Sequence, residues 1–236
     1  MNLIKDKWTQ VDAKPFLNYL KTFSKGEEKS LWEKRIVNTG LPCLAVPSTE
    51  IDKIASQIYK GNYVSFLDLW LWDNHSETLI FGKILNKIKD FDVLKKYLFK
   101  YSQKADNWST IDCLKFHFTK ENIEYFLEFS KELIKSKYTF QRRLALIILL
   151  KLLSHRDCTL VCFELLNSLL KEKEYYVNMA AAWLLAECMI KYREKTICYY
   201  QHNLTNDFII NKSISKCRDS FRISKEDKNF LLNFKR

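Results

Sequence analysis

The chain has 236 residues, of which 47% are hydrophobic, and only four are glycine and three are proline. So few turn formers argue against a protein built from β-hairpins, and the length suits one core or a short array of repeats. The 39 Lys and Arg residues outnumber the 28 Asp and Glu residues, and the net charge of +11 favours an anionic partner. Nucleic acid is the first candidate and an acidic membrane surface the second, although no run of about 18 apolar residues could span a bilayer.

The first residues and the cysteines indicate the compartment. Residues 1–7 carry neither an apolar signal region nor an Arg-rich transit pattern, so we expect a cytoplasmic protein, in the cytosol or nucleoid of a bacterial-type cell. The seven cysteines are odd in number, lack a Cys-x-x-Cys pair and lie mostly in apolar helical runs, which predicts reduced core residues. Cys158 and Cys162 with His155 could suggest a metal site, but no second ligand pair follows at a suitable spacing. We therefore expect neither a metal nor another cofactor.

The N-terminal quarter is predicted to be helical with one interruption. Residues 1–38 should form two helices. Residues 38–48 hold one of the four glycines and two of the three prolines, and so cannot form a regular helix. Ser48 or Thr49 is then expected to cap a helix that runs to residue 60. The interruption is the main break in the chain.

From residue 61 onward, paired helical segments repeat, and their second members begin about 30–36 residues apart. Segment 144–150 is apolar on every side, as expected for a helix packed between neighbours. These features predict an all-α fold, a single HEAT-like repeat domain over residues 1–236 in which antiparallel helix pairs stack into a curved α-solenoid. The predicted pairs are 62–72 with 77–89, 91–103 with 107–118, 121–136 with 139–153, 159–171 with 175–192, and 194–203 with 207–222.

Equivalent helices of such a stack lie side by side, so the second helices should together line one surface. Trp108 and Asp112 are four residues apart and therefore share one helix face. A carboxylate, two indoles and several cations would then meet in one groove. Each residue also has a plainer interpretation, because Trp108 and Trp183 could be packed core residues and Asp112 a solvated helix acid. The residues predicted to line the groove are Trp108, Asp112, Arg142, Arg143, Trp183, Lys212 and Lys216.

The last predicted helix, 207–222, carries the clearest charge signal. From residue 209 to the end of the chain there are eight Lys and Arg residues against three Asp and Glu residues. Such a run is often a solvated face, but as an extension of the proposed groove it predicts contacts to phosphates. One apolar stripe is predicted at Ile210, Ile214, Cys217 and Phe221. The cations on the other sides are Lys212, Lys216, Arg218 and Arg222.

Four segments, in this order and at these separations, resemble the DNA alkylation repair proteins of the AlkD-like class of HEAT-like DNA glycosylases. They are residues 107–112, 140–146, 175–187 and 211–222, and the resemblance covers about 61 to 228. No single motif is specific, but the four in order are. By this resemblance Asp112 matches the acidic residue of the family's active cleft, and Trp108 and Trp183 match its two aromatic walls. Arg143 matches an arginine at the DNA backbone.

The resemblance implies a monofunctional DNA glycosylase that removes purines alkylated at N3 or N7. Such a base is cationic, which weakens its glycosidic bond, and its departure leaves cationic character on the sugar. A fixed carboxylate stabilises that charge, and indole faces hold the cationic base by cation–π attraction. The implied partner is double-stranded, alkylated DNA, with no small-molecule cofactor and no membrane, and the implied oligomeric state is a monomer.

One segment departs from the family pattern. Glycosylases of this family tend to follow the proline of the N-terminal loop with a basic helix start, whereas residues 47–52 here contain Glu50 and Asp52 and no arginine. A non-catalytic HEAT-like binder of damaged or structured DNA is therefore the first alternative. A HEAT-like protein scaffold is the second, and the excess of cations disfavours it.

Overall fold

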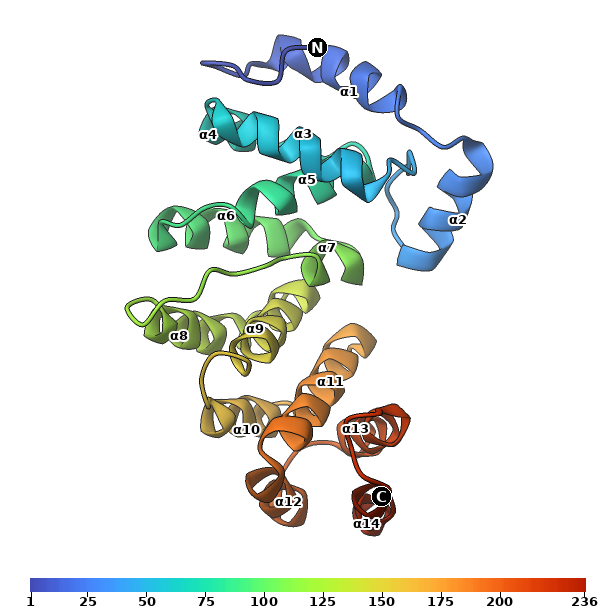
Figure 1. Cartoon of the computed structure of the whole chain (residues 1–236), viewed down its shortest axis with the longest axis vertical. Helices are drawn as coiled ribbons and strands as arrows, with labels where there is room; N and C mark the ends of the chain where they lie inside the picture. Colours follow the sequence, from blue (N-terminus) through green and yellow to red (C-terminus); the bar gives the residue numbers. More distant parts are fainter. The chain divides into compact units, whose positions relative to one another are not determined.

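The computed structural model describes residues 1–236 and consists of helices joined by turns and loops, without strands (Figure 1). This confirms the predicted all-α, solenoid-like class. The chain divides into two compact units, Met1–His117 and Phe118–Arg236. The single curved repeat domain expected from the sequence stays a prediction. No helix combines the length and the apolar character that crossing a membrane requires.

Two clusters of aromatic side chains form the core of the first unit. Trp8, Phe16 and Phe66 meet edge to face with ring centroids 5.0–5.7 Å apart. The second cluster includes Phe81 and Tyr101, which stack on one another and are both buried. Burial of each such ring contributes roughly 1.5–3 kcal/mol. The helices of this unit are η1 (Gln10–Asp12), α1 (Ala13–Lys21), α2 (Glu27–Val37), α3 (Ser48–Lys60), α4 (Tyr63–Leu69), α5 (His75–Leu85), α6 (Phe91–Lys104) and α7 (Trp108–Asp112).

The second unit is organised around α9, α11 and α13, which pack side by side in that order (Figure 1). Helix α8 packs on α9, while α10 and α12 both pack on α11. The prediction that equivalent second helices are neighbours is thus confirmed within this unit. Its helices are α8 (Ile123–Leu133), α9 (Thr139–Leu152), α10 (Thr159–Ser168), α11 (Tyr175–Lys191), α12 (Arg193–His202), α13 (Asp207–Asp219), α14 (Lys225–Phe230) and η2 (Leu231–Phe234).

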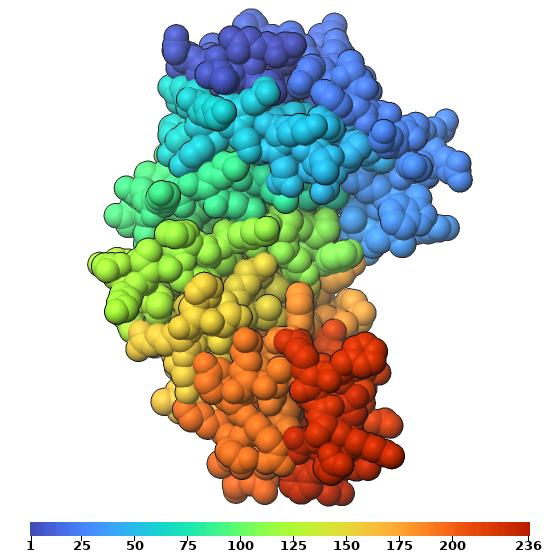
Figure 2. Space-filling view, viewed as in Figure 1, coloured from blue at the N-terminus to red at the C-terminus, as the bar shows by residue number.

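The sequences of α9 and α11 explain their central positions. Every side chain from 144 to 149 is buried, as expected for a helix with neighbours on all sides. In α11, Ala180, Ala181 and Ala182 are fully buried, and such small residues let adjacent helices approach closely. Trp183 follows them and is 37% exposed, so it projects from a helix that is otherwise mostly buried. Figure 2 shows that the last part of the chain, coloured red, forms an exposed face of this unit.

The predicted helices are found, with differences at their ends. Helix α7 ends at Asp112 instead of residue 118. Pro47 occupies the N-cap of α3, which lacks a side-chain cap, so the predicted cap at Ser48 or Thr49 is wrong. Proline is suited to this position because its fixed φ leads into a helix and its missing N–H is not needed there.

The predicted apolar stripe of the last helix is only partly correct. Ile210, Ile214 and Cys217 are buried. Helix α13 ends at Asp219, however, and Phe221 beyond it is fully exposed, so its place in the stripe was wrong. The sequence spacing continued a helical pattern past the point where the backbone becomes extended, at Ser220.

Candidate functional site

Helix α7 presents Trp108 and Asp112 as its first and last residues, and both side chains are partly exposed. Four residues of helix place them on one face. Asn107 caps the helix, because its Oδ1 accepts a hydrogen bond from the N–H of Thr110 at 3.0 Å. A helix of five residues has too few internal hydrogen bonds to be stable alone, so the surrounding side chains must hold it.

Two side chains, His75 from α5 and Tyr101 from α6, provide that support. The Tyr101 hydroxyl is fully buried and lies 3.0 Å from the carbonyl of Thr110 and 2.9 Å from that of Thr78. His75 Nε2 lies 2.9 Å from Ser109 Oγ. The backbone that carries Trp108 and Asp112 is therefore fixed from two neighbouring helices. Preorganisation of this kind is what a catalytic carboxylate requires.

Sequence reasoning missed His75 and Tyr101. Each looks like an ordinary core residue of an amphipathic helix, and the partners of His75 lie 42 and 34 residues away, at Glu33 and Ser109. The only available signal was a histidine directly after the capping residue Asn74, and that signal does not identify a partner.

The second unit brings four of the predicted residues onto adjacent helices. Arg143 belongs to α9, Trp183 to α11, and Lys212 and Lys216 to α13. Trp183 and Lys216 line one hollow of about 350 Å³, together with Glu187. Burial and the charges of Lys212 and Arg143 lower the pKa of Lys216. The positive charges of Lys212 and Arg143 are thus felt at Lys216.

Arg143 is largely buried, and its guanidinium donates a hydrogen bond to the carbonyl of Tyr176 at 2.5 Å. That contact fixes the side chain between α9 and the start of α11. Arg142 points elsewhere. It forms a two-point ion pair with Glu172, with N···O distances of 2.7 and 3.2 Å, and a further hydrogen bond to the carbonyl of Ser136. The charge of Arg142 is thus neutralised within the protein.

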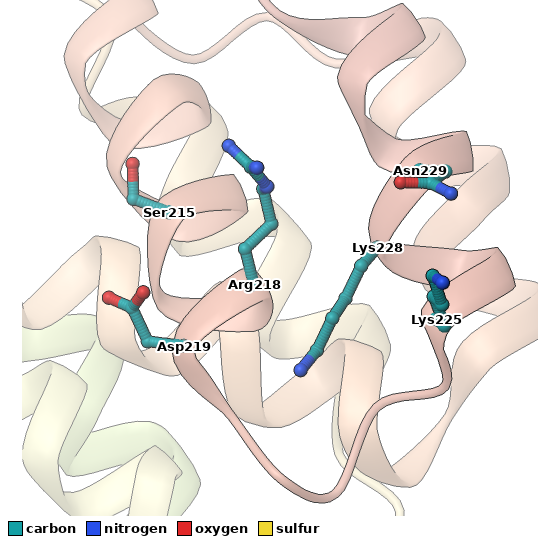
Figure 3. Close-up of a pocket in the computed structure, with 6 residues that line it drawn as sticks. All are labelled: Ser215, Arg218, Asp219, Lys225, Lys228 and Asn229. Atoms are coloured by element: carbon teal, nitrogen blue, oxygen red, sulfur yellow. The ribbon is translucent and has the colours of Figure 1, made fainter.

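Arg222 is also paired, in its case with both carboxylate oxygens of Glu187. Arg218 is different, because it makes no ion pair and lines an exposed hollow of about 380 Å³ between α13 and α14. Figure 3 shows Arg218 and Lys228 extending from their helices into the space between them. Lys225 completes the group of cations, and Asp219 is the one acid at the hollow. Sequence reasoning missed the two lysines, because they follow the last predicted helix.

The acidic start of α3 is less negative than its sequence suggests. Glu50 is 2.7 Å from Lys53, and Asp52 is 2.9 Å from Lys83 on α5. Both carboxylates therefore have a cation beside them. Exposed pairs of this kind are screened by solvent and contribute little to stability, but they do reduce the local charge.

The predicted site residues thus fall into two groups. Trp108 and Asp112 belong to the first unit, and all the predicted DNA-contacting cations and Trp183 belong to the second. Within each unit the predicted neighbours are together. That both groups share one groove stays a prediction.

Comparison with known proteins adds the family. A family model described as DNA alkylation repair enzyme matches residues 11–212, which extend from η1 into α13. The match includes Trp108, Asp112, Arg143 and Trp183 and ends at Lys212, so the hollow between α13 and α14 lies beyond it. No curated protein matches the chain at a significant level. With most of its length covered by that family model, the chain belongs to the DNA alkylation repair enzyme family, and its partner is accordingly DNA.

Proposed function

We propose that the protein is a monofunctional DNA glycosylase that removes cationic N3- or N7-alkylated purines from double-stranded DNA. The observation that carries the proposal is the pair of Trp108 and Asp112 on one face of a short helix that Tyr101 and His75 hold in place. An indole and a carboxylate on one rigid face suit a reaction that begins with a cationic base and develops positive charge on a sugar.

In the proposed reaction, the bond between C1′ of the sugar and the purine nitrogen breaks, and both bonding electrons leave with the base. The alkylated base departs as a neutral molecule, and the sugar becomes an oxocarbenium-like cation. Asp112 stabilises that cation, and water then adds at C1′ and loses a proton. Trp108 holds the cationic base by its ring face, with about 0.5–2 kcal/mol for the contact. Trp183, on the second unit, is proposed as a further aromatic contact to the DNA.

Arg143, Lys212 and Lys216 are proposed to contact the DNA backbone. Their support is that Lys216 lines the same hollow as Trp183, and that Lys212 on α13 and the largely buried Arg143 on α9 act electrostatically on Lys216. Arg218 joins them through the basic hollow in Figure 3. Arg142 and Arg222 are paired with Glu172 and Glu187, so a role for them on DNA would require an exchange of ion-pair partners.

The decisive experiment measures release of methylated purine from DNA by wild-type protein and by the Asp112→Asn variant. The variant keeps the size and hydrogen-bonding groups of the side chain but removes its charge. We expect excision to slow by roughly 10², which corresponds to about 3 kcal/mol of transition-state stabilisation, while DNA affinity stays nearly level. Asp92→Asn, an exposed substitution on α6 in the same unit, is the matched control and should leave the rate unchanged.

The second candidate function is a non-catalytic binder of damaged or structured DNA. The acidic start of α3, with Glu50 and Asp52, favours it, because a glycosylase of this family is expected to present cations there. Wild-type protein that binds DNA but releases no methylated purine above the spontaneous rate would replace the first proposal with this one. Release by Asp112→Asn at the wild-type rate would instead show that the mechanism is wrong.

A further inference from the structure

A second group of chemically active side chains lies in the first unit, and none of them is proposed to contact the base or the sugar, although His75 also supports α7. A carboxylate oxygen of Glu33, the Cys43 sulfur and a ring nitrogen of His75 all lie within 4.8 Å of one another. They come from α2, from the segment between α2 and α3, and from α5. Carboxylate, thiolate and imidazole are the three side-chain ligands that Zn²⁺ takes in proteins.

The hydrogen bonds on the far side of His75 fix the direction of its ring. Asn107 Oδ1 is an acceptor, because the N–H of Thr110 donates to it and because Asn107 Nδ2 donates to Asp106. Ser109 Oγ lies 3.0 Å from that oxygen and donates its only proton to it. His75 Nε2, 2.9 Å from the same Ser109 Oγ, therefore carries a hydrogen and donates.

With its hydrogen on Nε2, a neutral His75 turns the bare lone pair of Nδ1 toward a Glu33 carboxylate oxygen 2.9 Å away. Two electron-rich atoms at that distance repel unless a cation lies between them. A proton shared by Nδ1 and the carboxylate oxygen would remove the repulsion between these two atoms. The sulfur of Cys43 is a third donor atom at the same place, and a metal ion is the cation that three converging donors can share.

We propose that Glu33, Cys43 and His75 form a Zn²⁺ site with three protein ligands and a fourth, open position for water. Bonds of about 2.0–2.3 Å to a tetrahedral ion place its ligand atoms roughly 3.3–3.6 Å apart, so the observed atoms need to move by about 1 Å. Binding displaces the thiol proton of Cys43 to solvent. The inference does not depend on glycosylase activity.

Two features around the three residues fit a metal site. His75 donates its other ring N–H to Ser109, the arrangement by which metal-bound histidines are usually oriented. Glu33 is oriented in the same way, because the N–H of Ala45 donates to its second oxygen at 2.9 Å. Ala45 has a φ of 50°, an unusual conformation for a residue with a side chain, and this conformation aims its N–H at Glu33.

One of the three residues borders the surface. Glu33 and Ala45 line a hollow of about 560 Å³, with Trp32 and Val46 as its apolar wall, whereas His75 is buried behind them. Cys43 is itself only partly buried. A bound ion would join α2, the segment that follows it, and α5, and through Ser109 it would add to the support of α7.

The test is a titration of chelator-treated full-length protein with Co²⁺, a reporter for Zn²⁺ whose thiolate complexes absorb strongly in the near ultraviolet. We expect one equivalent to bind with a thiolate-to-cobalt band that Zn²⁺ abolishes by competition. Cys43→Ser should remove the band and weaken Zn²⁺ binding by at least about a hundredfold. Ser109→Ala should keep the band and weaken binding about 10–100-fold, as loss of an outer partner does.

Cys198→Ser is the matched control, because Cys198 is exposed and its sulfur lies 3.9 Å from His202 Nδ1, a second place where cobalt could bind weakly. This variant should keep the full band. Absence of a cobalt–thiolate band in wild-type protein would mean that a proton alone bridges Glu33 and His75, and would overturn the proposal. A band that survives Cys43→Ser would overturn it as well. If that variant fails to fold by circular dichroism, Cys43→Ala provides the same comparison.

Discussion

Single residues decide how firmly α7 is held. Tyr101 supports the helix only because Gly82 lies opposite its hydroxyl. A Cβ at position 82 would come within 2.5 Å of the Tyr101 oxygen, closer than real contacts allow. Glycine costs about 1 kcal/mol in a helix relative to alanine, so its presence inside α5 is explained by this close approach.

Gly82→Ala should therefore destabilise the protein, by about 1–3 kcal/mol, although alanine is the better helix former. The clash prevails because Tyr101 is fully buried and has no space into which it can move. Urea unfolding measures the change. Tyr101→Phe removes the clashing oxygen, so the double variant should lose less stability than the sum of the two single variants.

Gly40→Ala is the control for that experiment, because a Cβ there meets only Asp106 at an ordinary 3.6 Å. It should change the free energy of unfolding by less than about 0.5 kcal/mol. Equal effects of the two glycine substitutions would show that the approach of Tyr101 is not what requires Gly82.

The ion pair of Arg142 and Glu172 gives a pH-dependent prediction. Burial alone raises the pKa of Glu172, but hydrogen bonds from Arg142 and from the N–H groups of Lys173 and Glu174 outweigh it, so the pKa is lowered. A carboxyl group with a lowered pKa stabilises the fold above its unfolded-state value, near 4.3, and that stabilisation is lost as the pH falls through the folded value.

Arg142→Gln should accordingly cost about 1–3 kcal/mol near neutral pH and progressively less below about pH 4. Urea unfolding of both proteins across this range measures the difference. Arg156→Gln is the matched control, because its partner Glu124 is exposed, and it should cost less than about 1 kcal/mol. A cost for Arg142→Gln that is the same at pH 3 and pH 7 would exclude the ion pair as its cause.

At the scale of helices, α13 and α14 illustrate how binding and stability oppose each other. Arg218, Lys225 and Lys228 line one hollow, while two acids close to these helices are already paired, Asp227 with Arg193 and Glu187 with Arg222. The repulsion among the three cations is only partly offset by Asp219. A bound phosphate would relieve it.

Lys228→Glu should therefore act with opposite signs on two measurements. The free energy of unfolding should rise by a few tenths of a kcal/mol, because one repulsion becomes an attraction. DNA affinity at low salt should fall, because a phosphate contact is lost. Lys191→Glu, at the end of α11, is the control and should leave DNA affinity unchanged. A fall in both stability and affinity would instead indicate local unfolding of α14.

At the scale of the whole molecule, the net charge of +11 governs the encounter with DNA. Cations that neutralise phosphates release counterions, so the logarithm of affinity falls with the logarithm of salt by about 0.9 for each phosphate contacted. The slope of this dependence counts the phosphates contacted by the whole chain, so it is the appropriate first measurement.

Changing Lys212 and Lys216 together to Ala should weaken binding to all sequences alike and reduce the steepness of that salt dependence by up to about 1.8. Fluorescence anisotropy at several salt concentrations measures both quantities. The control changes two other lysines together to Ala, Lys131 on α8 and Lys135 just after it. It makes the same change of charge and should leave the slope unchanged. Binding that does not respond to salt would revive the protein-scaffold alternative.

The sequence was informative where a pattern is local. Helical spacing predicted α9 and α11 closely, and an aromatic and an acid four residues apart predicted the face of α7. The sequence was not informative where contacts between residues far apart in the chain determine the structure. Neither the pairing of Arg142 with Glu172 nor that of Glu33 with His75 is visible in residue spacing, because the partners are 30 and 42 residues apart in the chain.

Helix α11 lies between α9 and α13, and α10 and α12 also pack on it. Its amide hydrogens should therefore exchange with solvent only when the second unit unfolds as a whole, whereas those of the six-residue α14 exchange through local fraying. Trp183 thus stands on the part of this unit that opens least often, whereas Lys225 and Lys228, two of the three cations of the hollow, stand on a helix that opens readily. A ligand that contacted Trp183 and these lysines would bind to a rigid aromatic side chain at one end and to a locally mobile charged helix at the other.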